Sequence, residues 1–308
     1  MNSSATAVVT GATGFIGARV VKALLESGAT VRVITSGSTS KHRLREHLTK
    51  VQWFGMSDHD LDQATRGATH LFNWAVVYDR QEYPDSLIYD VNVNLPLRIL
   101  ERLLAQAGPT TCVLGDTFFR KYLPQATKQA RYTQSKQVLW EVVNTLEIGP
   151  CMRIAFLQIE QIYGPGDALT KVIPLITSRI LANDPRIALT SGSQRRDFIY
   201  VDDVARAAMF VTDAMDWNGK IVVECGSGES HTVRAIFEQL HAIVGSTSVL
   251  GFGDLDNDQS IYDSKADIKW LRHHGWKQTI SLTNGLIALA NDIAARLIPD
   301  HDPNLRDL

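Results

Sequence analysis

The chain has few cysteines, no long apolar run and little net charge, and each shortage excludes a class of protein. Its cysteines, Cys112, Cys151 and Cys225, are odd in number and widely spaced, which argues against a disulfide framework or a zinc site. No apolar run approaches the about 18 residues that a membrane span requires. A formal net charge of -2 gives no electrostatic basis for binding nucleic acid or a membrane surface.

The remaining composition is that of a folded globular protein. Hydrophobic residues make up 44% of the 308 residues and charged residues 21%, which argues against disorder. The first residues lack the basic region and the cleavage site of a secretory signal, so no signal peptide is expected. We therefore expect a cytoplasmic protein that binds no metal, no nucleic acid and no membrane.

Short apolar runs alternate with segments of helical period along the first half of the chain. Strands are predicted over residues 5–10, 30–35, 70–76, 111–114 and 152–159, and helices over 16–26 and 96–106. This alternation predicts an α/β fold of Rossmann type, with a doubly wound parallel sheet covered on both faces. Loop signals are denser in the second half, where we expect a smaller, mainly C-terminal α/β substrate lobe. We assign residues 1–160 and 196–225 to the dinucleotide-binding domain, and 161–195 and 226–308 to the lobe.

A glycine-rich turn follows the first predicted strand and opens the first predicted helix. Glycines 11, 14 and 17 permit a tight turn, a close approach of the backbone to a pyrophosphate and close helix-to-strand packing. The N–H groups at the start of the helix favour the phosphates. We therefore predict a bound dinucleotide, with contacts from Gly11, Thr13, Gly14, Phe15, Ile16 and Gly17.

The end of the second predicted strand indicates which dinucleotide binds. An Asp or Glu at this place would bond the ribose 2′-hydroxyl of NAD, but residues 35–43 contain no acid. Hydroxyls and cations stand there instead, which suit a 2′-phosphate. We favour NADP(H), with contacts from Thr35, Ser36, Ser38, Lys41 and Arg43. NAD(H) stays an alternative, because the segment can also be interpreted as an ordinary solvated basic loop.

Tyr132 and Lys136 are spaced four residues apart on a predicted helix and therefore share one face. A lysine ammonium and the positive charge of an oxidised nicotinamide would favour phenolate, so Tyr132 is a candidate to exchange a proton with a carbonyl or alcohol. The alternative is a surface pair. The basic residues that precede Tyr132, among them Arg120, Lys121 and Arg131, are interpreted as a solvated charge run or a substrate-facing loop.

Six motifs occur in the order typical of extended short-chain dehydrogenases/reductases, over nearly the whole chain. They are the glycine turn, Asn92 in its Val-Asn-Val-Asn segment, the Tyr132/Lys136 pair, residues 163–167, residues 196–205 and residues 271–276. The chain thus resembles the NAD-dependent epimerase/dehydratase type, which includes nucleotide-sugar epimerases, dehydratases and 4-ketoreductases. Residues 74–80, 115–117 and 162–167 look most like the CDP-abequose and CDP-paratose synthase branch, whose members reduce a 4-keto-6-deoxyhexose with NADPH.

The resemblance implies further site residues. Thr117 matches the catalytic Ser/Thr that bonds the substrate oxygen beside the tyrosine, although a threonine at a strand end is also a common cap. By the same resemblance, Ala75, Asn92, Tyr132, Lys136 and Ile159 contact the cofactor, and Val77, Asp116, Gln161 and Arg196 contact the substrate. Arginine suits a diphosphate because its guanidinium binds phosphate oxygens in pairs.

Departures from the family pattern distinguish between reactions. Sugar 4,6-dehydratases place an Asp-Glu pair after the catalytic threonine, and the enzymes that make GDP-fucose need a cysteine there. Phe118 and Phe119 stand at these places, so dehydration and double epimerisation are disfavoured. The substrate arginine that the family supplies between positions 254 and 267 is missing, which weakens the nucleotide-sugar assignment.

These observations predict an NADPH-dependent 4-ketoreductase that acts on a nucleotide-activated 4-keto-6-deoxy sugar. In this hypothesis hydride passes from NADPH to the sugar C4, Tyr132 gives the proton, and Lys136 holds the cofactor ribose. One alternative is a nucleotide-sugar 4-epimerase that keeps NAD bound, and another is a non-catalytic dinucleotide-sensing protein. The resemblance also implies a homodimer packed through the two helices that follow Val91 and Tyr132.

Overall fold

A computed structural model describes residues 5–37, 39–106, 108–123, 130–214, 216–256 and 263–298. The chain divides into two compact units. Unit 1 consists of Met1–Ile159, Asp202–Cys225 and Asp267–Lys277, and unit 2 of Glu160–Val201, Gly226–Ala266 and Gln278–Leu308. Both units are therefore assembled from segments that are far apart in the sequence.

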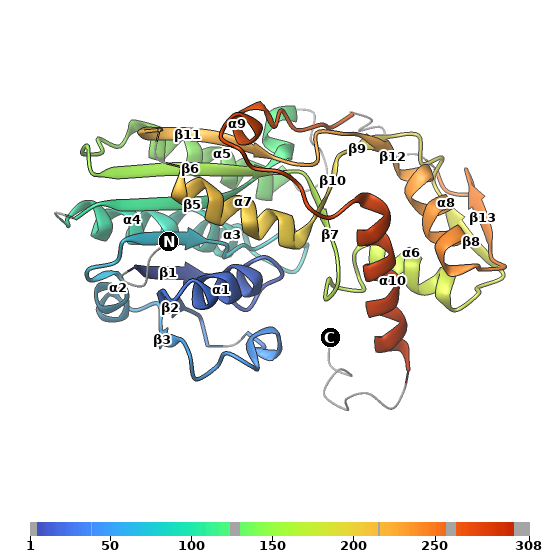
Figure 1. The fold of residues 1–308 in the computed structure, drawn as a ribbon, viewed down its shortest axis with the longest axis horizontal. Helices are drawn as coiled ribbons and strands as arrows, with labels where there is room; N and C mark the ends of the chain where they lie inside the picture. The colour runs from blue at the N-terminus through green and yellow to red at the C-terminus, as the bar shows by residue number, and fades with distance from the viewer. Residues whose placement is uncertain are drawn as a thin grey trace. The chain divides into compact units, whose positions relative to one another are not determined.

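Unit 1 is built on a parallel sheet of seven strands in the order β11-β6-β5-β4-β1-β2-β3 (Figure 1). The strands are β1 (Thr6–Thr10), β2 (Thr30–Ile34), β3 (Gln52–Phe54), β4 (His70–Asn73), β5 (Thr110–Thr117), β6 (Met152–Ile159) and β11 (Gly219–Cys225). The order of the strands reverses between β1 and β4, which pair directly. Sheets of this type bind ligands outside the carboxyl ends of the strands at such a point.

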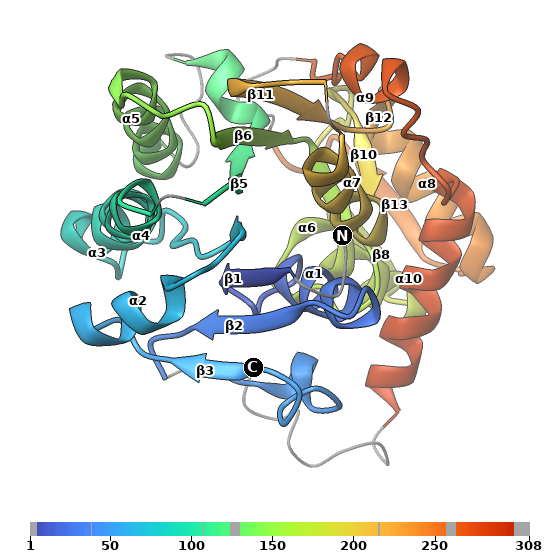
Figure 2. The ribbon, with the colours of Figure 1, turned by 60° about the vertical axis from the view of Figure 1, so that its left-hand side comes forward.

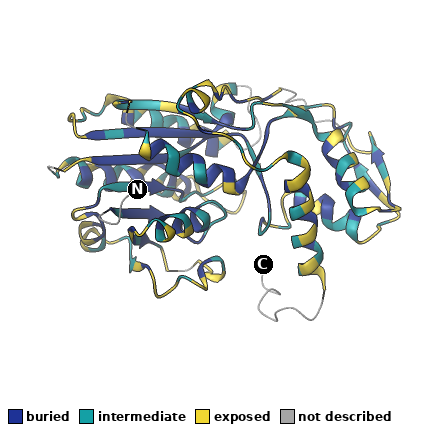
Figure 3. Ribbon diagram, in the orientation of Figure 1, coloured by how far each residue is buried: buried dark blue, intermediate teal, exposed yellow. Residues whose placement is uncertain are grey.

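Helices cover both faces of this sheet, as its apolar strands require. They are α1 (Gly17–Glu26), α2 (Asp58–Thr65), α3 (Asp85–Tyr89), α4 (Leu95–Leu104), α5 (Ala130–Thr145), α7 (Val201–Asp213) and α9 (Lys269–His273). Figure 2 shows α1 and α7 on one face and α2, α4 and α5 on the other. The central strands are buried accordingly (Figure 3), and Ala7, Val8 and Val9 of β1 have no exposed surface.

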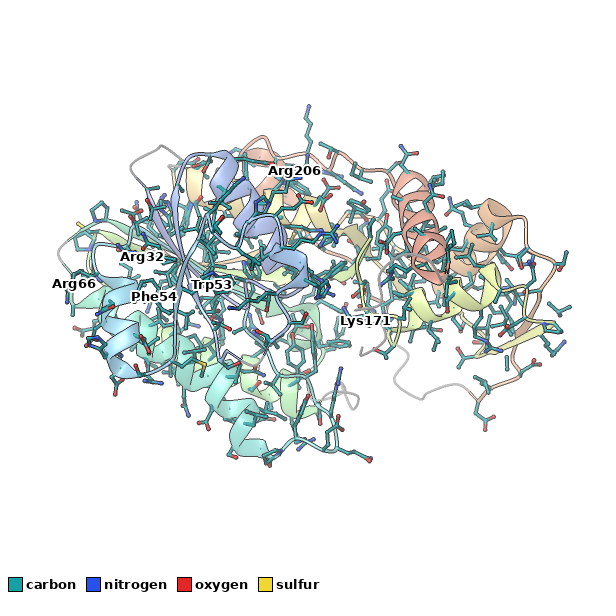
Figure 4. The ribbon with its side chains drawn as sticks, turned by 90° about the horizontal axis from the view of Figure 1, so that it is seen from below. Arg32, Trp53, Phe54, Arg66, Lys171 and Arg206 are labelled. Atoms are coloured by element: carbon teal, nitrogen blue, oxygen red, sulfur yellow. The ribbon has the colours of Figure 1, made fainter. Side chains whose placement is uncertain are left out.

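Three short helical turns complete unit 1 as far as its residues are described. The turns η1 (His42–Leu44) and η3 (Phe118–Tyr122) are 3-10 helical, and η2 (Asp90–Asn94) is a π-helical turn that joins α3 to α4. At the outer strands, the Arg32 guanidinium of β2 donates to the Ala64 and Arg66 carbonyls at 3.1 and 2.6 Å, which ties α2 to the sheet (Figure 4).

The described part of unit 2 contains three helices and three two-stranded sheets. The helices are α6 (Val172–Leu181), α8 (Val233–Val244) and α10 (Leu282–Leu297). The parallel pairs are β7 (Gln161–Tyr163) with β10 (Phe198–Tyr200) and β8 (Arg186–Leu189) with β13 (Val249–Phe252), and the antiparallel pair is β9 (Arg195–Arg196) with β12 (His231–Thr232). Their apolar side chains form one core around Tyr163, Ile187 and Leu240. The Lys171 ammonium before α6 pairs with Asp167 at 2.8 Å (Figure 4).

The predicted fold class is confirmed, with a doubly wound parallel sheet and a smaller α/β unit. The strands β3 and β11 were not predicted, and β5 continues to Thr117, beyond the predicted end at residue 114. The contacts group residues 196–201 with unit 2 and residues 267–277 with unit 1. Among the described segments, no helix combines the length and apolar character that crossing a membrane requires.

Candidate active site

The glycine turn lies at the reversal point of the sheet and leaves no room for a side chain at Gly11 or Gly17. Gly11 has φ of +61°, and a Cβ there would lie 2.4 Å from the Trp74 carbonyl carbon. A Cβ on Gly17 would lie 2.1 Å from the Gly11 oxygen. These close approaches require glycine, and they form the kind of backbone cradle that a pyrophosphate needs. Residues 11–17 therefore fit a dinucleotide.

Hydrogen bonds connect the ends of β1 and β4 beside this turn. The Thr10 hydroxyl donates to Asn73 Oδ1 at 2.7 Å and accepts from the Ala75 N–H at 3.1 Å. The bonds fix the backbone at Ala75, one of the predicted cofactor contacts, next to the glycine turn.

Threonine hydroxyls and an arginine surround the end of β2. The Thr39 hydroxyl lies 3.2 Å from that of Thr13 and 3.4 Å from that of Thr35, and Arg43 Nη1 donates to the Thr13 carbonyl at 3.4 Å. Thr39 was not singled out from the sequence. The other predicted contacts here are Ser36 and Ser38. Ser36 is the residue directly after Thr35, and Ser38 lies outside the described residues.

Lys41 was also a predicted phosphate contact, but its side chain is engaged elsewhere. Its ammonium lies 4.2 Å from the centre of the Trp53 ring on β3, in cation–π geometry (Figure 4). Arg43, which reaches back to the glycine turn, is therefore the better placed of the two cations.

Tyr132 and Lys136 lie in the first two turns of α5 and face the end of β5. Lys136 Nζ donates to the Gly115 carbonyl at 2.7 Å and lies 6.0 Å from the centre of the Tyr132 ring. Thr117 caps η3 by accepting from the Phe119 N–H at 3.3 Å, and its side chain is also hydrogen-bonded to Tyr132. The three predicted catalytic residues are thus brought together, and Thr117 both caps the turn and contacts the tyrosine.

Burial shifts the pKa of both ionisable members of this group. It raises the pKa of Tyr132 well above 10, with smaller contributions from Tyr78 and Asp116 in the same direction, while the Thr117 hydrogen bond opposes the shift. Burial lowers the pKa of Lys136 to about 8. At neutral pH Tyr132 is therefore a protonated phenol and Lys136 is mostly an ammonium. Loss of the tyrosine proton would require additional positive charge, which an oxidised nicotinamide would supply.

Asn92 connects the loop after β4 to the helix that carries Tyr132. Its side-chain amide accepts from the Val77 N–H at 2.8 Å and donates to the Val77 carbonyl and the Ser135 hydroxyl at 2.9 Å each. The Ser135 hydroxyl in turn donates to the Tyr132 carbonyl at 2.7 Å. Asn92 is fully buried, in the π-helical turn η2. In this structure its amide positions protein groups, including Val77, the predicted substrate contact.

Two residues of this region have contacts that the sequence did not predict. The Tyr78 ring is 41% exposed and lies 5.0 Å from the Tyr132 ring, so it forms an accessible aromatic surface beside the tyrosine. The Arg131 side chain donates to Asp79 and Asp85 at 2.8 Å and to the Arg80 carbonyl at 2.9 Å. Arg131 therefore fixes the loop that carries Tyr78, while its side chain stays 34% exposed.

The remaining predicted contacts occupy three places. Asp116 is buried at the end of β5 and paired with Arg120, and Ile159 is buried at the end of β6. Gln161 and Arg196 belong to unit 2, where Gln161 begins β7 and Arg196 Nη1 donates to the Arg195 carbonyl at 2.7 Å. The described residues include no group of three or more acidic, histidine or cysteine side chains that could hold a metal ion.

A reversing parallel sheet, a glycine cradle and a Thr-Tyr-Lys group together define a dinucleotide-dependent enzyme of the extended short-chain dehydrogenase/reductase class. The chain belongs to the NAD dependent epimerase/dehydratase family, whose family model matches residues 7–226. Its cofactor is a nicotinamide dinucleotide.

Two curated proteins and one solved structure illustrate the similarity. The chain is 28% identical over 282 residues to a CDP-abequose synthase of Salmonella muenchen, covering 91% of this chain and 94% of that protein. It is 25% identical over 305 residues to a putative UDP-glucose 4-epimerase of Methanocaldococcus jannaschii, covering 92% and 97%. The structure of UDP-glucose 4-epimerase from Thermotoga maritima with UDP-glucose matches with a TM-score of 0.77 at 22% identity, covering 95% and 99%.

Proposed function

We propose that this enzyme is an NADPH-dependent 4-ketoreductase that acts on a nucleotide-activated 4-keto-6-deoxy sugar. The similarity to a CDP-abequose synthase over 91% of the chain supports the substrate class. The observation that carries the proposal is the convergence of Tyr132, Thr117 and Lys136 at the end of β5, where Lys136 Nζ donates to the Gly115 carbonyl at 2.7 Å and the phenol of Tyr132 is buried. A protonated phenol at this place can give its proton to the oxygen of a carbonyl as it is reduced, and the ammonium of Lys136 would stabilise the phenolate that is left.

In this proposal each residue has a defined task. Thr117 and Tyr132 hold the sugar carbonyl oxygen by hydrogen bonds, and Tyr132 gives it the proton. Lys136, fixed by the Gly115 carbonyl, supplies positive charge beneath the phenol and holds the cofactor ribose. A nicotinamide dinucleotide held by Gly11, Thr13, Gly14 and their neighbours would supply the hydride.

The surroundings of Thr117 favour reduction over elimination of water. Phe118 and Phe119 follow it, with ring centres 4.2 Å apart, and Phe118 is 2% exposed. Elimination requires an additional acid and base beside the tyrosine, and neither phenylalanine can transfer a proton.

The direct test is to incubate the protein with NADPH and CDP-4-keto-6-deoxyglucose. We expect stoichiometric loss of NADPH absorbance at 340 nm and formation of a CDP-6-deoxyhexose two mass units heavier than the substrate. Sugar-free CDP serves as the control for non-specific oxidation of NADPH. Failure to consume NADPH with CDP-, dTDP-, GDP- and UDP-linked 4-keto-6-deoxy sugars would reject the proposal.

A nucleotide-sugar 4-epimerase is the second candidate, because the similarity to a putative UDP-glucose 4-epimerase covers 92% of the chain. An epimerase returns the hydride that it removes, so it commonly retains its dinucleotide through purification. Conversion of UDP-glucose to UDP-galactose without added cofactor, together with bound NAD released by denaturation, would favour this candidate. A dinucleotide sensor without activity would bind cofactor and fail both assays.

Arg196 tests the nucleotide part of the proposal separately. We expect Arg196→Ala to weaken binding of CDP by about 10- to 150-fold, about 1.5 to 3 kcal/mol, because a charge-assisted contact to the diphosphate is lost. Binding of NADPH should not change. Arg195→Ala is the matched control, since the Arg195 guanidinium is held by the Ser230 hydroxyl at 3.1 Å. Equal affinities of wild type and Arg196→Ala, measured by calorimetry, would remove Arg196 from the substrate site.

A further inference from the structure

A buried ion pair lies directly beside the catalytic residues. Asp116 stands between Gly115 and Thr117 at the end of β5, and its Oδ2 accepts from Arg120 Nε at 2.9 Å and Nη2 at 2.7 Å. The side chains of Asp116 and Arg120 are only 1% and 9% exposed. Removing two charges from water is costly, so such a pair is weak evidence for a stabilising role and invites another explanation.

Arg120 also contacts the helix that carries the catalytic tyrosine and lysine. Its guanidinium carbon lies 4.7 Å from the centre of the Trp140 ring, and Nη1 lies 3.4 Å from Gln137 Oε1. Both partners belong to α5, and Trp140 follows Lys136 by one turn. The ion pair therefore links the end of β5 to α5.

The neighbours of Asp116 contact the same helix directly. The Gly115 carbonyl accepts from Lys136 Nζ at 2.7 Å, and the Thr117 side chain is hydrogen-bonded to Tyr132. Three consecutive residues at the end of β5 thus contact α5, the middle one through Arg120. Any displacement of this strand end would alter both catalytic contacts.

The carboxylate also acts on the catalytic groups through its charge. It adds to the increase in the pKa of Tyr132 that burial causes, and it opposes the decrease in the pKa of Lys136 that burial causes. Both effects have the sign expected of a negative charge near these two side chains. Without the guanidinium beside it, the carboxylate would be a full negative charge next to a phenol that must give up a proton.

We propose that Asp116 and Arg120 are positioning residues, which fix the end of β5 against α5, and that the guanidinium opposes the effect of the carboxylate charge on Tyr132. This proposal rests on the proposed role of Tyr132 in proton transfer. It gives Asp116 a role different from the substrate contact that the sequence predicts, because the carboxylate is buried and occupied by Arg120.

The sign of the charge effect provides the test. The phenol of Tyr132 is titrated by NMR in protein labelled with ¹³Cζ-tyrosine and saturated with NADP⁺, and its signal is assigned with Tyr132→Phe. Arg120→Met leaves a lone carboxylate and should raise the titration midpoint of Tyr132 by about one pH unit. Asp116→Asn leaves a lone guanidinium and should lower it. The double variant Asp116→Asn/Arg120→Met should return close to the wild-type midpoint.

Two further variants keep the test decisive. Lys121→Met is the matched control, because the neighbouring Lys121 pairs with Glu224 at 2.8 Å instead and its loss should leave the midpoint unchanged. Arg120→Gln replaces Arg120→Met if the latter does not fold, and the same upward shift is expected. The proposal would be overturned if the two single variants shift the Tyr132 midpoint in the same direction. It would also be overturned if the double variant shifts the midpoint as far as either single variant does.

The titration does not depend on turnover, so it separates this proposal from the proposed function. If Tyr132 is not the proton donor, Tyr132→Phe retains activity whatever the titrations give. If the ion pair only supports the fold, the variants lose thermal stability while the midpoint of Tyr132 stays at its wild-type value, and the proposal is wrong.

Discussion

Basic side chains lie at both the carboxyl ends and the amino ends of the strands in unit 1, in different surroundings. At the carboxyl end of β5, Lys136 Nζ donates to the Gly115 carbonyl and burial lowers its pKa to about 8. At the amino end of β4, burial lowers the pKa of His70 to about 4, and the ring Nδ1 lies 2.8 Å from the Thr69 hydroxyl. Nearby, Arg153 donates to the Ala214 carbonyl at 2.8 Å.

The difference lies in what the polar groups face. At the amino end, Arg153 also donates to the Thr111 hydroxyl and the Thr212 carbonyl, so its donors are used within the protein. At the carboxyl end, Lys136 lies with Thr117 and Tyr132 at the same edge of the sheet as the glycine cradle. A shifted pKa occurs at both ends, so it does not mark a functional site by itself. A functional site is marked instead by several reactive groups that converge beside a ligand cradle.

The largest expected effect is at the carboxyl end. Tyr132→Phe should lower kcat by about 10² to 10⁴-fold, the usual contribution of a general acid, because it removes the proton donor and preserves the ring. Cofactor binding should stay intact when followed by nicotinamide fluorescence. The control is Tyr89→Phe, which alters a half-buried tyrosine of α3 packed on the core. Turnover of Tyr132→Phe near the wild-type rate would show that Tyr132 is not the proton donor and that the two ends do not differ in this respect.

The amino end should instead control stability as a function of pH. His70 is neutral in the folded protein, and its pKa of about 4 lies below the usual 6.5. As the pH falls through 6.5, the unfolded chain binds a proton that the folded protein resists, so the free energy of unfolding decreases until about pH 4. The full loss is about 3 kcal/mol.

His70→Phe should abolish this part of the pH dependence without changing kcat at pH 7. The neighbouring charges of Asp213 and Arg153 are unchanged in this variant. Urea unfolding at pH 7 and pH 4 measures the difference, with the exposed His59→Gln as the control. A pH dependence equal to that of the wild type would show that His70 is not the responsible group.

Arg153 tests the same difference between the two ends, with a smaller expected effect on stability. Arg153→Met should lower the free energy of unfolding by about 2 kcal/mol, because it leaves carbonyls and the Thr111 hydroxyl without their donor. The methionine preserves contact with the Trp217 ring, which the guanidinium carbon approaches to 4.8 Å. The kcat should not change. A loss of activity greater than the loss of folded protein would mean that the two ends are coupled.

Local patterns in the sequence were sufficient to predict the frame of the site. The glycine spacing and the Tyr132/Lys136 spacing each lie within one element, so their geometry follows from the turn and the helix alone. The parallel sheet followed from alternating periodicity. The strand β3 was missed because three residues are too few to show a pattern, and β11 was missed within a half of the chain interpreted as loop-rich.

Interactions between distant or irregular segments could not be predicted in the same way. Arg131 belongs to a basic run in the sequence, but its partners Asp79 and Asp85 are about 50 positions earlier. The pairing of Asp116 with Arg120 depends on the 3-10 turn η3, which carries the arginine back over the strand end. The pairing of these charges, and the burial of Asp116 and Arg120, are tertiary effects about which local pattern carries no information.

The smallest expected effect concerns the carboxyl end of β2. Its measurement tests whether the ligand-binding edge of the sheet extends to this strand. Residues 35–43 contain no acid that would repel a 2′-phosphate, and Arg43 reaches the glycine turn through the Thr13 carbonyl. Arg43→Ala should raise the KM for NADPH by about tenfold, about 1.4 kcal/mol, and leave the KM for NADH nearly unchanged. Lys41→Ala is the matched control, because its ammonium is held on the Trp53 ring. The measurement is the ratio of kcat/KM for the two cofactors in each protein. A wild-type ratio in favour of NADH would reject the NADPH assignment and put the epimerase first, since a permanently bound NAD would then explain this end of the sheet more simply.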